Sequence, residues 1–138
     1  MEKYKITENG YHPFLISEGW QVAQLNYMDE QQIDNIYRMD AHHKTDEVFV
    51  LLKGKAALIL AEFEDNDAVF EVELMKARTI YNIPKNKWHN IAMEKGSEVL
   101  IVEKSNTHLN DVSFKNLSIN NLKALKELVE EVLNKKQV

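Results

Sequence analysis

Two neighbouring histidines and a carboxylate stand close together in the sequence, at His42, His43 and Glu47. If His43 and Glu47 lie on one β-strand, their even spacing sends both side chains to the same face. An imidazole and a carboxylate on one buried face are suited to holding a metal ion or to moving a proton. Whether these residues bind a metal ion or transfer a proton depends on the side chains that lie opposite this face.

A third histidine, His89, follows a loop signal that begins at Pro84. The proline stops a strand, and Asn86 tolerates the left-handed geometry of a tight turn. In an antiparallel barrel, the next strand can bring His89 opposite His43 and Glu47. Two imidazoles and one carboxylate would form a set that leaves coordination positions open for water or substrate.

Short strands separated by turn signals must position these residues. Stretches in which apolar residues alternate with polar ones are separated by turn signals such as glycine and proline. We therefore predict strands at 11–16, 20–27, 33–39, 48–52, 56–63, 68–74, 78–83, 88–94 and 98–103. This pattern predicts an all-β fold, an antiparallel sandwich or barrel. The segment 105–115, which is rich in asparagine and serine, is expected to be a surface loop.

The C-terminal segment has a helical pattern. Apolar residues recur there at three- and four-residue steps between charged ones, and Ser118 is suited to cap the helix. We expect residues 1–116 to form the barrel with its N-terminal strands. Residues 117–138 should form an amphipathic helix that packs on the barrel or on a partner subunit, within a single domain.

The composition is that of an ordinary soluble globular protein, with 138 residues and a formal net charge of -5. The negative charge and the lack of a basic patch argue against nucleic acid as a partner. The sequence has no cysteine, which excludes disulfides, thiolate metal ligands and a cysteine nucleophile. No apolar run has the character of a signal peptide or the length of a membrane span, so we expect a cytoplasmic protein without a membrane partner.

The spacing His43-x3-Glu47-x6-Gly54, followed by Pro84-x4-His89, resembles the two sequence motifs of the cupin superfamily. The resemblance implies a small β-barrel of the jelly-roll type. It also implies a divalent metal ion inside the barrel, with iron, manganese, zinc and nickel not distinguishable. Carried over to this sequence, the metal ligands implied by the resemblance are His43, Glu47 and His89.

The resemblance covers roughly residues 35–103, and its ligand set is reduced. Ala41 stands where the first motif has its first histidine, and strand alternation points His42 to the other face. Asn86 replaces a glycine of the second motif, and Met93 replaces its closing asparagine. The alanine therefore either opens a coordination position or marks a dismantled metal site.

Four other side chains have strand positions that could line the cavity of a barrel. They are Tyr37, Phe49, Tyr81 and Met93. The Tyr81 hydroxyl is the one most expected to face a ligand, and ordinary core packing is the alternative for these side chains.

The sequence leaves three functions open. The first is a metal-dependent enzyme of oxygenase or isomerase type that acts on a small molecule in the barrel. The second is a metal-free protein that binds a small ligand, and the third is a dimeric scaffold without catalysis. No catalytic residue and no organic cofactor can be assigned. Exposed sheet edges and the terminal helix predict a homodimer.

Overall fold

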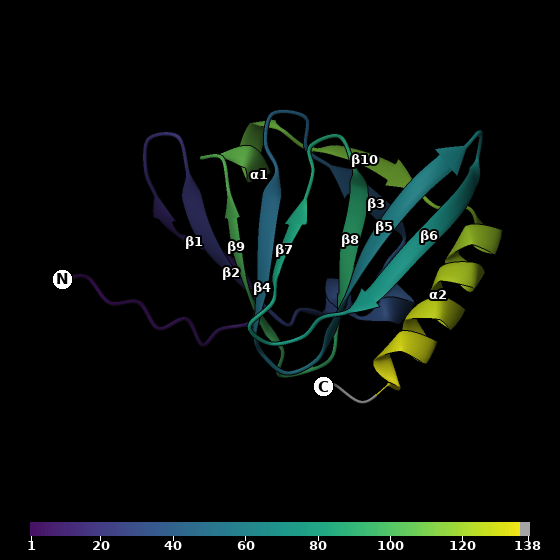
Figure 1. Cartoon of the computed structure of the whole chain (residues 1–138), viewed down its shortest axis with the longest axis horizontal. Helices are drawn as coiled ribbons and strands as arrows, with labels where there is room; N and C mark the ends of the chain where they lie inside the picture. Colours follow the sequence, from purple (N-terminus) through teal and green to yellow (C-terminus); the bar gives the residue numbers. More distant parts are fainter. Residues whose placement is uncertain (136–138) are drawn as a thin grey trace.

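The computed structural model describes residues 1–135, which are mostly β and form two antiparallel five-stranded sheets (Figure 1). The first sheet contains, in spatial order, β1 (Gly10–Ile16), β2 (Gln21–Asn26), β9 (Glu98–Glu103), β4 (Glu47–Lys53) and β7 (Ile80–Ile83). The second contains β10 (Ser113–Asn116), β3 (Arg38–Ala41), β8 (Trp88–Met93), β5 (Ala56–Glu64) and β6 (Asp67–Leu74). No strand pairing joins the two sheets within residues 1–135, so the predicted barrel is open.

Strand β5 shows how the sequence builds two apolar layers. Its first residues form a continuous apolar run, and most of them are buried. Ala56 and Leu58 point into the core between the sheets, whereas Ala57 and Ile59 point into a second core on the outer face. A strand that is covered on both faces needs apolar residues at successive positions, which explains the lack of alternation here.

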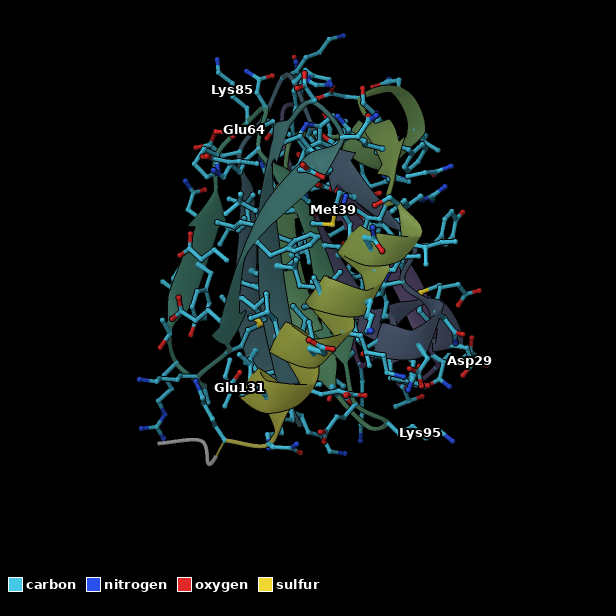
Figure 2. All side chains as sticks on the ribbon, turned by 90° about the vertical axis from the view of Figure 1, so that its right-hand side faces the viewer. Asp29, Met39, Glu64, Lys85, Lys95 and Glu131 are labelled. Carbon is cyan, nitrogen blue, oxygen red and sulfur yellow. The ribbon has the colours of Figure 1, made fainter. Side chains whose placement is uncertain are left out.

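Helix α2 (Ile119–Leu133) covers this outer face. Its side chains Leu125 and Val129 are almost fully buried in one cluster with Met39 and Ile59. Figure 2 looks onto the helix from outside and shows Met39 close to its first turns. The predicted C-terminal helix is therefore present from residue 119 to residue 133, on the second sheet. Residues 136–138 of the predicted segment lie outside the described part of the chain.

The helix begins as its sequence predicts. The Ser118 side chain accepts a hydrogen bond from the backbone N–H of Asn121 at 3.1 Å. We expect Ser118→Ala to lower the free energy of unfolding by about 1 kcal/mol, because this N–H loses its partner. Urea unfolding measures the change. Ser17→Ala is the control, since Ser17 is exposed in the turn after β1 and should give almost no change.

Two segments differ from the sequence prediction. Part of 33–39 forms the 3₁₀ helix η2 (Ile33–Asn35), which follows η1 (Asp29–Gln31). The Gln32 side chain accepts from Asp34 N at 2.8 Å, so a local cap overrides the weak apolar alternation. The predicted loop 105–115 contains the short helix α1 (Thr107–Asn110) and the start of β10, which pairs with β3.

Within the described residues, no helix has both the length and the apolar character that crossing a membrane requires. The expected homodimer and cytoplasmic location remain predictions.

Candidate functional site

Three side chains from three strand ends meet in one cluster: His42, Glu47 and His89. His42 directly follows β3, Glu47 opens β4, and His89 is the second residue of β8. Since neighbouring strands are antiparallel, these positions lie at one end of the two sheets. This is the end at which β9 finishes, at the top of Figure 1.

The three side chains are buried and surround one carboxylate oxygen. Glu47 Oε2 lies 3.0 Å from His42 Nε2 and 2.8 Å from His89 Nε2. This oxygen has no further hydrogen-bond partner among the described residues. The candidate ligand atoms all lie within 4.8 Å of one another. A buried, unpaired carboxylate oxygen between two imidazoles fits a bound cation.

The other ring nitrogens support this interpretation. His42 Nδ1 lies 2.7 Å from the carbonyl oxygen of Asp111, and His89 Nδ1 lies 2.9 Å from that of Lys87. A carbonyl only accepts, so each Nδ1 carries the hydrogen, and the Nε2 of a neutral ring then presents a lone pair to Glu47. Metal-binding histidines are commonly oriented in this way. Converging lone pairs and a carboxylate need either a metal ion or additional protons.

Electrostatics shows the state of the cluster without a metal ion. Burial alone would lower the pKa of His42, but its contact with the Glu47 carboxylate raises that pKa to about 9. The pKa of His89 is also raised, because Glu47 outweighs its burial. Burial would favour neutral Glu47, yet the two imidazoles hold its pKa below the ordinary value. Metal-free protein at neutral pH therefore holds an imidazolium–carboxylate group here.

A cavity of about 290 Å³ adjoins the cluster, and a second carboxylate lines it. Glu103, the last residue of β9, places Oε2 3.9 Å from His42 Nε2. Its Oε1 accepts hydrogen bonds from the Tyr11 hydroxyl at 2.9 Å and from Gln21 Nε2 at 3.0 Å. Burial, and then the charge of Glu47, raise the pKa of Glu103 to about 7. The cavity thus contains both a candidate metal site and a carboxyl group able to hold a proton near neutral pH.

The structure brings Glu47 and His89 together, but His43 lies outside the cluster. His43 is exposed, with Nδ1 2.8 Å from Asn86 Oδ1 and Nε2 2.7 Å from Ser113 Oγ. The expectation that His43 points inward with Glu47 is wrong, because residues 43–46 lie in a loop and the alternation of β4 does not extend back through them to His43.

Alternation in β3 explains why His42 takes the inward position. Met39 packs beneath helix α2, whereas Asp40 lines the cavity. Ala41 then points to the face of Met39, and His42 points to the face of Asp40. Ala41 is therefore not a lost ligand position.

The four other residues that we expected to line the cavity lie in different places. Phe49 lines the cavity, and Met93 is buried in the core away from it. Tyr37 is exposed beside Arg38, and the Tyr81 hydroxyl accepts a hydrogen bond from Lys76 N at 2.8 Å.

Sequence reasoning missed several residues that line the cavity. They are Tyr11, Asp40, Glu103 and His108. The two-residue step from Asp40 to His42 is the signal that could have identified Asp40, since residues at that spacing share a strand face. The distant pairing of Tyr11 with Glu103 has no local signal.

No protein-family model and no curated protein matches the sequence. The structure is similar to a mutant of the QdtA 3,4-ketoisomerase from Thermoanaerobacterium thermosaccharolyticum in complex with TDP, with a TM-score of 0.52 and 14% identity, covering 83% of this chain and 75% of that chain. It is also similar to a variant of PAC13 from Streptomyces with uridine, with a TM-score of 0.51 and 14% identity, covering 86% of this chain and 95% of that chain.

A cupin-2 domain containing protein from Shewanella frigidimarina also matches, with a TM-score of 0.49 and 18% identity, covering 72% of this chain and 84% of that chain. At such identities a structural likeness concerns the fold and not the reaction. The chain has the fold of the small cupin-type proteins.

Proposed function

We propose that this chain binds a divalent metal ion through His42, Glu47 and His89 and catalyses an isomerase-type reaction on a small molecule in the adjoining cavity. The observation that carries the proposal is the buried Glu47 oxygen, which lies within 3.0 Å of two imidazole nitrogens and has no hydrogen-bond partner among the described residues. A metal ion held there would act as a Lewis acid toward an oxygen of the ligand.

The protein's own residues prepare the site in two ways. The carbonyl groups of Asp111 and Lys87 fix both imidazole rings, so that their Nε2 atoms face the same point as Glu47. The cavity next to them is lined by apolar side chains that include Phe49, Ile91 and Ile101. A ligand bound there is therefore partly withdrawn from water, which strengthens its interactions with charged groups.

Glu103 is the candidate for proton transfer. Tyr11 and Gln21 hold one of its carboxyl oxygens, and the other faces the cavity beside His42 without a hydrogen-bond partner. A carboxyl group fixed at one oxygen can accept a proton from a ligand carbon or hydroxyl and return it to a neighbouring atom. Proton transfer between two atoms of one substrate needs no co-substrate, which supports an isomerase-type reaction. The similar fold of a 3,4-ketoisomerase is consistent with it.

A metal-free protein that binds a small ligand is the second candidate. The raised pKa values of His42 and His89 favour it, because a protonated imidazole can neutralise the charge of Glu47 without a metal ion. In that case the cavity would bind its ligand in the same place, and metal content would not affect binding.

Neighbouring histidines provide a matched test of the metal site. The chelator-treated chain is titrated with Mn²⁺, Fe²⁺, Ni²⁺ and Zn²⁺ in a competition assay, and metal content is measured by elemental analysis. We expect His42→Ala to weaken metal binding by about 100-fold, because it removes a ligand. His43→Ala should leave the affinity nearly unchanged, since the His43 ring lies outside the cluster and bonds to Asn86 and Ser113.

Two results would contradict the metal proposal. One is wild-type protein without specific affinity for any of the four ions. The other is an equal loss of affinity in the two variants, which would mean that metal binds at the exposed histidine or through general disruption of the loop.

A further inference from the structure

The cavity beside the candidate metal site is rich in unpaired hydrogen-bond acceptors. Among the described residues, four buried side-chain polar atoms have no hydrogen-bond partner, and all four are oxygens: Gln31 Oε1, Asp40 Oδ1, Glu47 Oε2 and Glu103 Oε2. All four residues line this one cavity. Buried acceptors without donors are costly, so their concentration at one place indicates a ligand that supplies donors.

Glu103 is the most firmly held of these groups. Its side chain is 2% exposed, and Oε1 already accepts from Tyr11 and Gln21. Gln21 is itself fixed, because its Oε1 accepts from Asn106 N at 2.8 Å. The carboxyl plane is therefore set before a ligand arrives, and Oε2 is the acceptor left for it.

Asp40 supplies a second acceptor from the facing sheet. Its Oδ1 lies 3.7 Å from Arg38 Nε, which is too far for a hydrogen bond. The Arg38 guanidinium lies 3.7 Å from the centre of the Phe114 ring, and this cation–π contact keeps it at the cavity wall. Asp40 on β3 and Glu103 on β9 thus present acceptors from opposite sheets, and one ligand can donate to both.

The remaining lining residues narrow the chemistry of this ligand. An ammonium ligand would meet Arg38 and the two imidazoles of the metal site, and an anionic ligand would meet three carboxyl groups. Apolar side chains line the cavity together with these acceptors, among them Phe49, Ile91 and Ile101. A ligand with neutral hydroxyl groups on a carbon skeleton suits both the acceptor oxygens and the apolar side chains of the cavity. The cavity volume of about 290 Å³ restricts this ligand to a small molecule.

We infer that the cavity binds a monosaccharide-sized polyhydroxy ligand, whose hydroxyl groups donate hydrogen bonds to Asp40 and Glu103. The inference rests on the proposed function, because it names the ligand class of the same site. Aldoses are the natural first ligands to test, since their ring carries hydroxyl donors around C–H faces.

Saturation-transfer NMR and calorimetry test this on the full chain, loaded with the ion that binds best. The ligands are D-glucose, D-galactose, D-mannose, D-ribose, L-arabinose and D-xylose, with putrescine and succinate as cationic and anionic competitors. We expect at least one aldose to bind saturably and more tightly than either competitor. Glu103→Gln and Asp40→Asn should each weaken it about tenfold or more, because each replaces an acceptor oxygen with a donor group. Glu62→Gln, which changes an exposed carboxylate on β5, should not weaken aldose binding.

The inference is overturned if no aldose binds, if putrescine or succinate binds more tightly, or if neither cavity variant changes the affinity. Circular dichroism and metal content are recorded for every sample, and the two independent variants keep the test decisive if one of them misfolds. Metal binding without aldose binding removes only this inference. Aldose binding without metal binding removes only the metal part of the proposed function.

Discussion

Replacing Gly54 by alanine should lower the free energy of unfolding by about 3–5 kcal/mol. Gly54 lies in the turn from β4 to β5 with a φ of 83°, which favours glycine. A Cβ atom at this position would lie 2.6 Å from both the Cα and the Oγ of Ser97. Ser97 cannot move easily, because its hydroxyl donates to the Lys55 carbonyl at 2.7 Å and accepts from Lys55 N at 2.9 Å. The clash would therefore break a buried connection between two turns.

Gly96→Ala is the matched control for this prediction. Gly96 has a similar φ of 85°, but a Cβ there would meet no atom within 4 Å. It should cost only about 1 kcal/mol, from backbone strain. Urea unfolding followed by tryptophan fluorescence measures both. Equal losses in the two variants would show that the contact with Ser97 is unimportant and that strain alone makes glycine necessary.

The β architecture could be predicted because its signal is local. Strand β9 alternates buried Val99 and Ile101 with half-buried neighbours, and the turn glycine Gly96 separates it from β8. The helical period of α2 is equally visible, since Leu125 and Val129 fall four residues apart on its buried face. Such patterns show which face of a strand or helix packs against the core. They can be detected without knowing which other element packs there.

The choice between His42 and His43 could not be made in this way. It depends on the loop 42–46, which is held by a residue far along the chain. The two carboxylate oxygens of Asp111 accept from His43 N at 3.0 Å and from Lys44 N at 2.9 Å, and the Asp111 carbonyl orients the His42 ring. Extending the strand phase through this loop reversed the two histidines. A contact across nearly 70 residues leaves no periodic signal in the sequence.

The second carboxylate of the cavity escaped prediction for a related reason. Glu103 closes an apolar strand, where an acidic residue is usually solvated. It is buried because β1 and β2 bring Tyr11 and Gln21 to its side chain, and both donate to it. Only the assembled sheet shows that this glutamate faces the same cavity as Glu47.

The strongest effect on the site is expected from Glu47→Gln, which keeps the shape of the side chain and removes its charge. Metal affinity should fall by about 1,000-fold, because the variant lacks both an anionic ligand and the charge that offsets the burial of a cation. In chelator-treated protein the pKa of His42 should fall well below 9, since burial is then opposed only by the Asp111 carbonyl and the charge of Glu103. NMR titration of the ring protons measures this change.

The same substitution should alter how stability depends on pH. A histidine whose pKa is higher in the folded chain stabilises it fully below the unfolded pKa and loses that contribution as pH rises. Metal-free wild type should therefore lose about 3 kcal/mol between pH 6.5 and pH 9 through His42, and Glu47→Gln should not. Asp46→Asn is the control, because Asp46 is an exposed neighbour that bonds to Asn82 and Lys85 instead. If the pKa of His42 stays high in Glu47→Gln, the carboxylate does not set the charge of the site, and the contacts that define the candidate metal centre are not those of the protein in solution.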